Sequence, residues 1–138
     1  MAESKSLRIA YGEALAELGA ENDKIVVLDA DLSNATMTNR FSAVYPDRFF
    51  DFGIAEANMV GIAAGLAAVG FKPICHSFGP FASRRCYDQA FMSAGYAHND
   101  ITIIGTDPGV CAGYNGGTHM PFEDMAMYRA LPGATVVD

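Results

Sequence analysis

A single carboxylate stands at the entrance to the most apolar stretch of this chain. Glu56 follows a short aromatic strand predicted over residues 48–52 and the glycine Gly53, and no residue between Asn58 and Gly70 can ionise. A glutamate in the first turn complements the helix dipole and stabilises the helix by roughly 0.3–1 kcal/mol. The same position suits a carboxylate that acts on a bound ligand, so both interpretations stand at this point.

Two phenylalanines follow the next predicted strand. Phe78 and Phe81 come directly after the run 71–77, and ligands of parallel sheets bind beyond the carboxyl ends of the strands. Packing in the core explains such side chains as well as an aromatic wall near Glu56 does. A carboxylate beside an aromatic wall would suit a flat heterocycle that presents a ring nitrogen.

The three histidines differ in their surroundings. His119 follows Gly116 and Gly117, so it is either an exposed loop residue or a group that moves protons near neutral pH. We interpret His76, at a strand end, as a structural residue with its hydrogen bonds satisfied, and His98 as a surface residue. The two glycines are only a weak phosphate signal, because no Walker or G-x-G-x-x-G context surrounds them.

Composition excludes several classes of protein. The chain has 138 residues and a formal net charge of -7, which predicts one domain whose surface repels nucleic acids and anionic membranes. The three cysteines have neither disulfide-framework nor metal-ligand spacing, and we expect no metal site. The start shows no secretory signal and the apolar run 59–71 is too short to span a bilayer, so we predict a cytoplasmic protein.

The elements that would position these residues alternate along the chain. We expect a doubly wound, mostly parallel α/β sheet with helices on both faces. Helices are predicted over 7–19, 36–45 and 81–96, from Glu56, and from about Pro121. Strands are predicted over 25–28, 48–52, 71–77, a fully buried 101–105, and 134–138.

Two further patterns depend on this arrangement. The strand ends carry Asp29 and Asp31, residues 53–56, residues 77–81 and residues 107–119, so these groups should meet at one rim of the sheet. The helix from Glu56 has small residues at spacings of three and four, which we interpret as a packing or subunit surface. They are Gly61, Ala64, Gly65 and Ala68.

Several motifs in this order resemble the pyrimidine-binding domain of transketolases. They are Ala30-Asp31-Leu32, Gly53-Ile54-Ala55-Glu56-Ala57-Asn58-Met59 with the helix after it, Ser77-Phe78-Gly79-Pro80-Phe81, Tyr87-Asp88-Gln89 and Gly117-Thr118-His119. The resemblance runs from about Leu7 to Asp138 and is closest to the C-terminal subunit of split transketolases. It implies a single pyrimidine-binding domain over 1–138 with the thiamine-diphosphate-binding fold.

The resemblance also implies a set of roles. The family glutamate matching Glu56 bonds N1′ of the aminopyrimidine of thiamine diphosphate and favours the tautomer that activates the thiazolium. The aromatic residue matching Phe81 stacks on the pyrimidine with Phe78 nearby, and Asp31 matches an aspartate close to the cofactor. The histidine matching His119 contacts substrate oxygens and assists proton transfer while a two-carbon ketol unit moves between sugars.

Other parts of the family's active site are missing from this sequence. The family holds the cofactor diphosphate through Mg²⁺ or Ca²⁺ with a Gly-Asp-Gly motif on another domain or subunit, and no Gly-Asp-Gly occurs here. The family's C-terminal domain is absent too. We therefore expect a hetero-oligomer or homodimer in which a diphosphate-binding partner completes the site, and no activity without that partner.

Three positions depart from the family pattern. Asp107 replaces a histidine that helps hold the substrate phosphate, Asn115 replaces an acidic residue of the substrate channel, and Arg84 replaces a common tyrosine. These changes predict a sugar that is unphosphorylated or enters differently. The alternatives are a non-catalytic assembly or regulatory module, a domain of a deoxyxylulose-phosphate synthase-like enzyme, and a piece of a longer enzyme.

Overall fold

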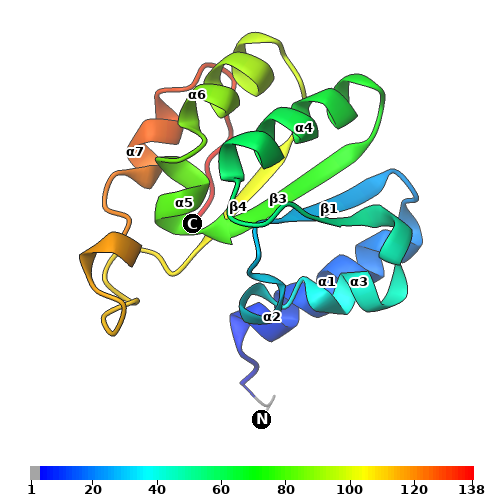
Figure 1. Cartoon of the computed structure of the whole chain (residues 1–138), viewed down its shortest axis with the longest axis horizontal. Coiled ribbons are helices and arrows are strands. Elements are labelled where there is room, and N and C mark those ends of the chain that lie inside the picture. The colour runs from blue at the N-terminus through cyan, green and yellow to red at the C-terminus, as the bar shows by residue number, and fades with distance from the viewer. Residues whose placement is uncertain (1–3) are drawn as a thin grey trace.

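Four parallel strands form the centre of the molecule. The computed structural model describes residues 4–138, so the start of the chain considered for a secretory signal lies partly outside the described residues. The strands pair in the order β2-β1-β3-β4, and all pairs are parallel (Figure 1). Their bounds are β1 (Ile25–Asp29), β2 (Phe49–Asp51), β3 (Lys72–Phe78) and β4 (Thr102–Thr106).

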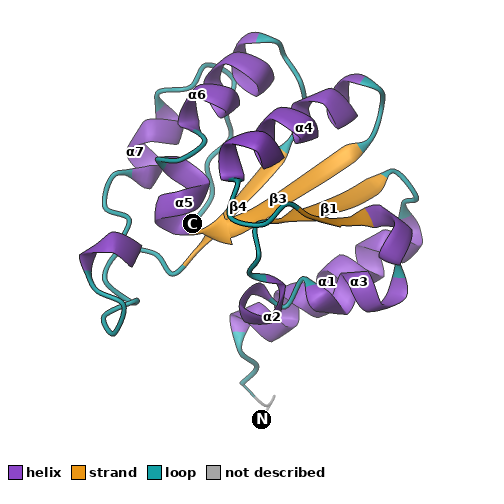
Figure 2. Ribbon diagram, viewed as in Figure 1, coloured by secondary structure: helices purple, strands orange, loops and turns teal. Residues whose placement is uncertain are grey.

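Helices cover both faces of this sheet (Figure 2). One face carries α1 (Leu7–Glu21), α2 (Ser33–Thr36) and α3 (Asn39–Val44), with the 3-10 turn η1 (Pro46–Arg48) leading into β2. The other side carries α4 (Glu56–Ala68), α5 (Gly79–Ser83), α6 (Tyr87–Gln89), the π-helix η2 (Ala90–Tyr96) and α7 (Asp124–Arg129), and a 3-10 turn η3 (Gly117–His119) precedes α7. The doubly wound parallel α/β class is therefore confirmed.

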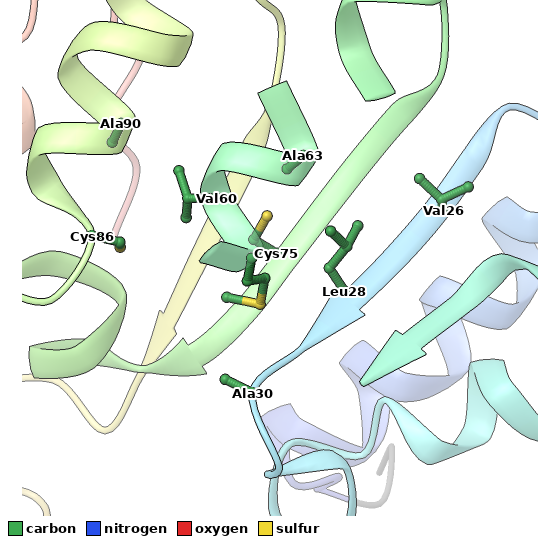
Figure 3. Packing of buried hydrophobic residues seen from close by; sticks show 9 residues of the cluster. Val26, Leu28, Ala30, Val60, Ala63, Cys75, Cys86 and Ala90 are labelled. Carbon is green, nitrogen blue, oxygen red and sulfur yellow. The ribbon is translucent and has the colours of Figure 1, made fainter. Parts of the chain in front are cut away.

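The alternation of side chains along β1 separates two cores. Val26 and Leu28 pack with α4 and with Cys75 of β3 on one face (Figure 3). Ile25 and Val27 pack under α1 and α3 on the other face. Every residue of β1 is buried, which is the physical reason that residues 25–28 are continuously aliphatic.

Two predictions about strands are wrong. The strand near 101–105 is not fully buried, because β4 lies at the edge of the sheet and exposes Thr102 and Gly105. Residues 134–138 form no strand. An aliphatic run records the tendency to extend but does not record whether a neighbouring strand covers it.

Two predicted helices are interrupted. Met37 has a left-handed backbone, with φ of 64°, and separates α2 from α3, so the predicted helix over 36–45 is helical only at Thr36, where α2 ends, and over 39–44. This bend lets the hydroxyl groups of Thr36 and Thr38 both reach the carboxylate of Asp29. The segment 81–96 is divided by a turn at 84–86, after which the chain continues as α6 and then as a π-helix.

The first helix ends differently from the prediction. It passes Gly19 and ends at Glu21, and Gly19 packs so closely that an added Cβ would lie 2.6 Å from Cε2 of Tyr45. The guanidinium group of Arg48 donates hydrogen bonds to the carbonyl oxygens of Gly19, at 2.8 Å, and Asn22, at 3.0 Å. Its Cζ lies 4.0 Å from the centre of the Tyr45 ring, so Arg48 closes this end of the helix from a distant part of the chain.

The surface of α4 divides into two parts. Ala64 is buried in the core, whereas Gly65 and Ala68 are exposed, and an added Cβ at Gly61 or Gly65 would meet nothing within 4 Å. The reading of this face as a subunit surface stays a prediction. Within residues 4–138, the helices fall short of the combined length and hydropathy needed to cross a bilayer.

Candidate functional site

The carboxylate of Glu56 is buried at the first residue of α4. Its side chain is 2% exposed, and the turn that delivers it passes through Gly53, whose φ of 67° favours glycine. The hydroxyl of Ser77 donates a hydrogen bond to Oε1 at 3.2 Å, and Nη1 of Arg85 donates to Oε1 at 3.2 Å and Oε2 at 3.3 Å. Glu56 is therefore a buried, compensated charge, which a role at the helix dipole alone does not require.

Three rings gather beside this carboxylate. The ring centroids of Phe78 and Phe81 lie 6.2 Å apart, and His119 lies 5.0 Å from Phe81 in an edge-to-face arrangement and 6.0 Å from Phe78. Cζ of Arg85 lies 3.7 Å from the centre of the Phe81 ring. The strand end, the start of α5 and the turn η3 thus bring the predicted aromatic wall and the predicted histidine together.

His119 is held by its neighbour in the chain. Oγ1 of Thr118 lies 2.9 Å from Nδ1 of His119 in a hydrogen bond. If the hydroxyl donates, Nε2 carries the ring proton and is the atom that can give it to a ligand. A half-buried histidine on a 3-10 turn at the sheet's rim suits proton transfer.

The two aspartates after β1 have different environments. Asp31 is exposed and has a left-handed backbone, with φ of 63°. Its N–H donates to Oδ1 of Asp51 at 3.0 Å, and the same oxygen accepts from the N–H of Gly53 at 2.9 Å. Asp51 therefore ties together the ends of β1 and β2 and the turn before Glu56.

Asp29 is fully buried beneath this rim. Oδ1 accepts from the N–H of Leu32 at 2.6 Å, and Oδ2 accepts from Thr38 at 2.8 Å and Thr36 at 3.1 Å. Burial raises the pKa of the Asp29 carboxyl, while these donors act to lower it. This group fixes the chain after β1 and leaves Asp31 free at the surface.

The residues that depart from the family pattern lie on the loop after β4 and on the segment after α5. Asp107 has φ of 60° and its Oδ1 lies 3.9 Å from Sγ of Cys111, while Asn115 is exposed farther along the same loop. Arg84 forms an ion pair with Glu123, and this interaction lowers the pKa of Glu123 to about 2. The charge of Arg84 is therefore already paired within the chain.

The interpretation of His76 as a satisfied residue is wrong. His76 is fully buried, and neither ring nitrogen has a hydrogen-bond partner among residues 4–138. It packs edge to face on Tyr11 at 4.9 Å, and the hydroxyl of Tyr11 likewise has no partner within that range. Burial lowers the pKa of His76 to about 4, so the ring is neutral at pH 7. The exposed position of His98 is confirmed.

Cysteines and metal ligands add little to this site. Cys75 and Cys86 are buried, Cys111 is exposed, and all three are free thiols. Burial raises the pKa of Cys86 to about 11, so this thiol is not a nucleophile at neutral pH. Among residues 4–138, no three His, Cys, Asp or Glu side chains are arranged to hold a metal ion.

A hollow of about 600 Å³ lies elsewhere, between β4, η2 and the C-terminal segment. Its lining includes Ile103, Tyr128 and Val136. Glu56, Phe81 and His119 lie outside it. The carboxylate and the three rings therefore belong to a different part of the molecule.

Sequence reasoning missed Arg85, Ser77 and Asp51 as members of the site. A usable signal existed for Arg85, because it follows Phe81 by four residues, the spacing at which side chains meet on one face of a helix. The hydrogen bond from Ser77 depends on the packing of α4 on β3, which no local pattern encodes. Asp51 was missed because it lies at the end of a strand that is otherwise aromatic, with no motif around it.

Comparisons with known proteins agree on one family. The family model described as transketolase, pyrimidine binding domain, matches residues 3–138. The 6-deoxy-6-sulfo-D-fructose transketolase subunit SqwH of Clostridium sp. (strain MSTE9) is 50% identical over 132 residues, which cover 96% of this chain and 41% of that protein. The putative transketolase C-terminal section of Methanocaldococcus jannaschii is 42% identical and covers 96% of this chain and 42% of that protein.

A solved structure has the same fold. It is described as a split gene transketolase, inactive beta4 tetramer, and superposes with a TM-score of 0.77 at 46% identity, covering 91% of this chain and 40% of that one. The chain thus spans about two fifths of the length of these relatives.

Proposed function

Because this chain belongs to the family of transketolase pyrimidine-binding domains, we propose that it forms the pyrimidine side of a thiamine-diphosphate site in a two-subunit transketolase. The reaction would transfer a two-carbon ketol unit between sugars. The membership of this chain in the family and its similarity to subunits of split transketolases support this proposal.

One observation carries the proposal: a flat, N–H-bearing group already stacks on Phe81 and bonds Glu56. That group is the guanidinium of Arg85, whose Cζ lies 3.7 Å from the ring centre and whose Nη1 bonds both carboxylate oxygens. The pair of Glu56 and Phe81 thus holds a planar N–H donor, and an aminopyrimidine ring is such a donor when its ring nitrogen carries a proton. The residues present fit the cofactor.

Each residue would then have a defined task. The carboxylate of Glu56 would exchange a proton with the pyrimidine ring nitrogen, and Phe81, with Phe78 behind it, would hold the ring plane. His119 would give or take a proton at a substrate oxygen, and Asp31 would lie near the cofactor. Thiamine diphosphate, when bound, would supply a nucleophilic carbon for the ketose carbonyl and would take up the electron pair of the neighbouring carbon–carbon bond when that bond breaks.

The diphosphate and its Mg²⁺ or Ca²⁺ would be held by a partner subunit. The similarity to subunits of split transketolases supports this assignment, as does a relative of similar fold that is described as an inactive tetramer. The partner would be a diphosphate-binding transketolase subunit, in a hetero-oligomer or in a dimer of assembled pairs. The three free thiols support a cytoplasmic location.

The substrate proposal rests on the loop after β4. The carboxylate of Asp107 would repel a sugar phosphate, Asn115 is uncharged, and Arg84 is paired with Glu123. We therefore propose a ketose without a terminal phosphate. Turnover should be compared for free, phosphorylated and sulfonated ketoses. The sulfonated sugar is included because one relative is named for 6-deoxy-6-sulfo-D-fructose. Turnover restricted to pentose phosphates would refute this proposal.

The test joins this chain with a Gly-Asp-Gly subunit expressed beside it. We expect the two to co-purify with thiamine diphosphate and to show ketol transfer that neither chain shows alone. Glu56→Gln should lower transfer by at least about a hundredfold, since it removes the proton exchange, whereas Glu17→Gln on the exposed face of α1 should not. Equal rates in wild type and Glu56→Gln would favour the non-catalytic module instead.

A further inference from the structure

We propose that Arg85 is an internal ligand that holds the place of the cofactor's pyrimidine ring, and that it must swing away before the cofactor binds. This inference rests on the proposed function. It concerns which side chain occupies the site before the cofactor binds, which membership of the family does not address.

The geometry of Arg85 carries the argument. Its guanidinium is flat and delocalised, stacks on Phe81 with Cζ 3.7 Å from the ring centre, and directs Nη1 at both oxygens of Glu56, at 3.2 and 3.3 Å. These are the two contacts that the pyrimidine is proposed to make. One face of Phe81 cannot hold both planes, so the guanidinium and the pyrimidine compete for it.

Burial explains why a placeholder is useful. The Glu56 side chain is 2% exposed, and its other hydrogen bond comes from the neutral hydroxyl of Ser77. A buried carboxylate without a charged partner lowers the stability of the fold. Arg85 supplies that charged partner before the cofactor binds. The fold can therefore form before the cofactor and the partner subunit arrive.

The same side chain has room to leave. Arg85 is 44% exposed in its side chain, in contrast to Glu56, so rotation of its long arm can carry the guanidinium into water while the pyrimidine takes over the contact with Glu56. Its neighbour Arg84 cannot take its place, because Arg84 is bound to Glu123 and to the carbonyl oxygen of Met120. Exchange thus involves one side chain and no movement of the backbone.

The test measures cofactor affinity rather than turnover. In the assembled two-subunit enzyme, titration calorimetry with thiamine diphosphate and Mg²⁺ is compared for wild type, Arg85→Gln, Arg85→Ala and the control Arg129→Gln, an exposed arginine of α7. If Arg85 fills the place about nine tenths of the time, its removal tightens binding about tenfold. Arg129→Gln should bind as wild type does. Circular dichroism verifies that the variants fold.

A second measurement needs no variant. In a crystal structure of the loaded wild-type enzyme, we expect the pyrimidine on Phe81 and the Arg85 guanidinium displaced from that face. Weaker or unchanged binding by both Arg85 variants, or a loaded structure in which Arg85 still stacks on Phe81, would overturn this inference alone. If wild type fails to bind the cofactor, the proposed function fails and this inference falls with it.

Discussion

The buried ring of His76 makes the free energy of unfolding depend on pH in a direction that can be worked out. His76 lies on β3 opposite Asp29 of β1 and packs against Tyr11 of α1. Burial lowers the pKa of His76 from 6.5 to about 4. Between pH 6.5 and about pH 4, the histidine is therefore protonated in the unfolded chain but neutral in the folded chain. Stability should therefore fall as pH falls through 6.5, and the loss should be complete below about 4.

The size of this loss follows from the shift. Full development of a shift from 6.5 to about 4 corresponds to about 3 kcal/mol, and going from pH 7 to pH 5 should remove about 2 kcal/mol of it. Asp29 acts in the opposite sense, because its raised pKa makes the folded chain take up a proton first and gain stability in acid. A comparison with a histidine variant separates the two groups.

The assay is urea unfolding followed by far-ultraviolet circular dichroism, since the sequence has no tryptophan. His76→Leu should remove about 2 kcal/mol of the difference between pH 7 and pH 5, and it should also relieve the two unpaired nitrogens at pH 7. His98→Asn, at an exposed position with φ of 56°, should keep the wild-type dependence. Identical pH dependence in wild type and His76→Leu would refute the reasoning.

Three further predictions concern binding and packing. Phe81→Ala should weaken thiamine diphosphate binding about tenfold by calorimetry, because the stacking surface is lost; an unchanged Kd contradicts this. Thr38→Val should cost about 1–3 kcal/mol in urea unfolding, because buried Asp29 loses a donor at 2.8 Å; an unchanged midpoint argues against that network. Gly19→Ala should lower the free energy of unfolding by about 1–3 kcal/mol, because the added Cβ would lie 2.6 Å from Cε2 of Tyr45. Gly65→Ala should raise the free energy of unfolding of the free chain by about 0.5–1 kcal/mol, because its added Cβ meets nothing within 4 Å and alanine favours the helix. Reversed signs for the two glycines would refute this packing.

The fold class was predictable because the signals that define it are local. Four aliphatic or aromatic runs separated by helical segments predicted the parallel sheet, and the continuous aliphatic run 25–28 of β1 correctly indicated burial on both faces. The edge position of β4 was not predictable, since the same run suits a central strand or an edge strand. The chain at 134–138 has strand-like residues but is not paired within the described structure.

The candidate site was predictable in part for the same reason. Glu56, Phe81 and His119 were singled out by residue type and by their places after strands, and the structure brings the rings and the carboxylate to one region. The contacts to Glu56 come from Ser77 and Arg85, whose directions depend on tertiary packing. His76 was misjudged because a sequence records a polar atom but not whether a partner reaches it.

The bonds from Arg48 to the end of α1 have a consequence for the order of folding. The carbonyl oxygen of Gly19 accepts a hydrogen bond from Arg48, which lies 29 positions later in the chain, whereas the carbonyl oxygen of Asn22 accepts from both Arg48 and the nearby N–H of Ile25. We therefore expect the last turn of α1 to fray during synthesis until the segment that contains Arg48 has left the ribosome. A fragment that ends before Arg48 should therefore have a shorter α1 than the complete chain, in which this helix extends to Glu21.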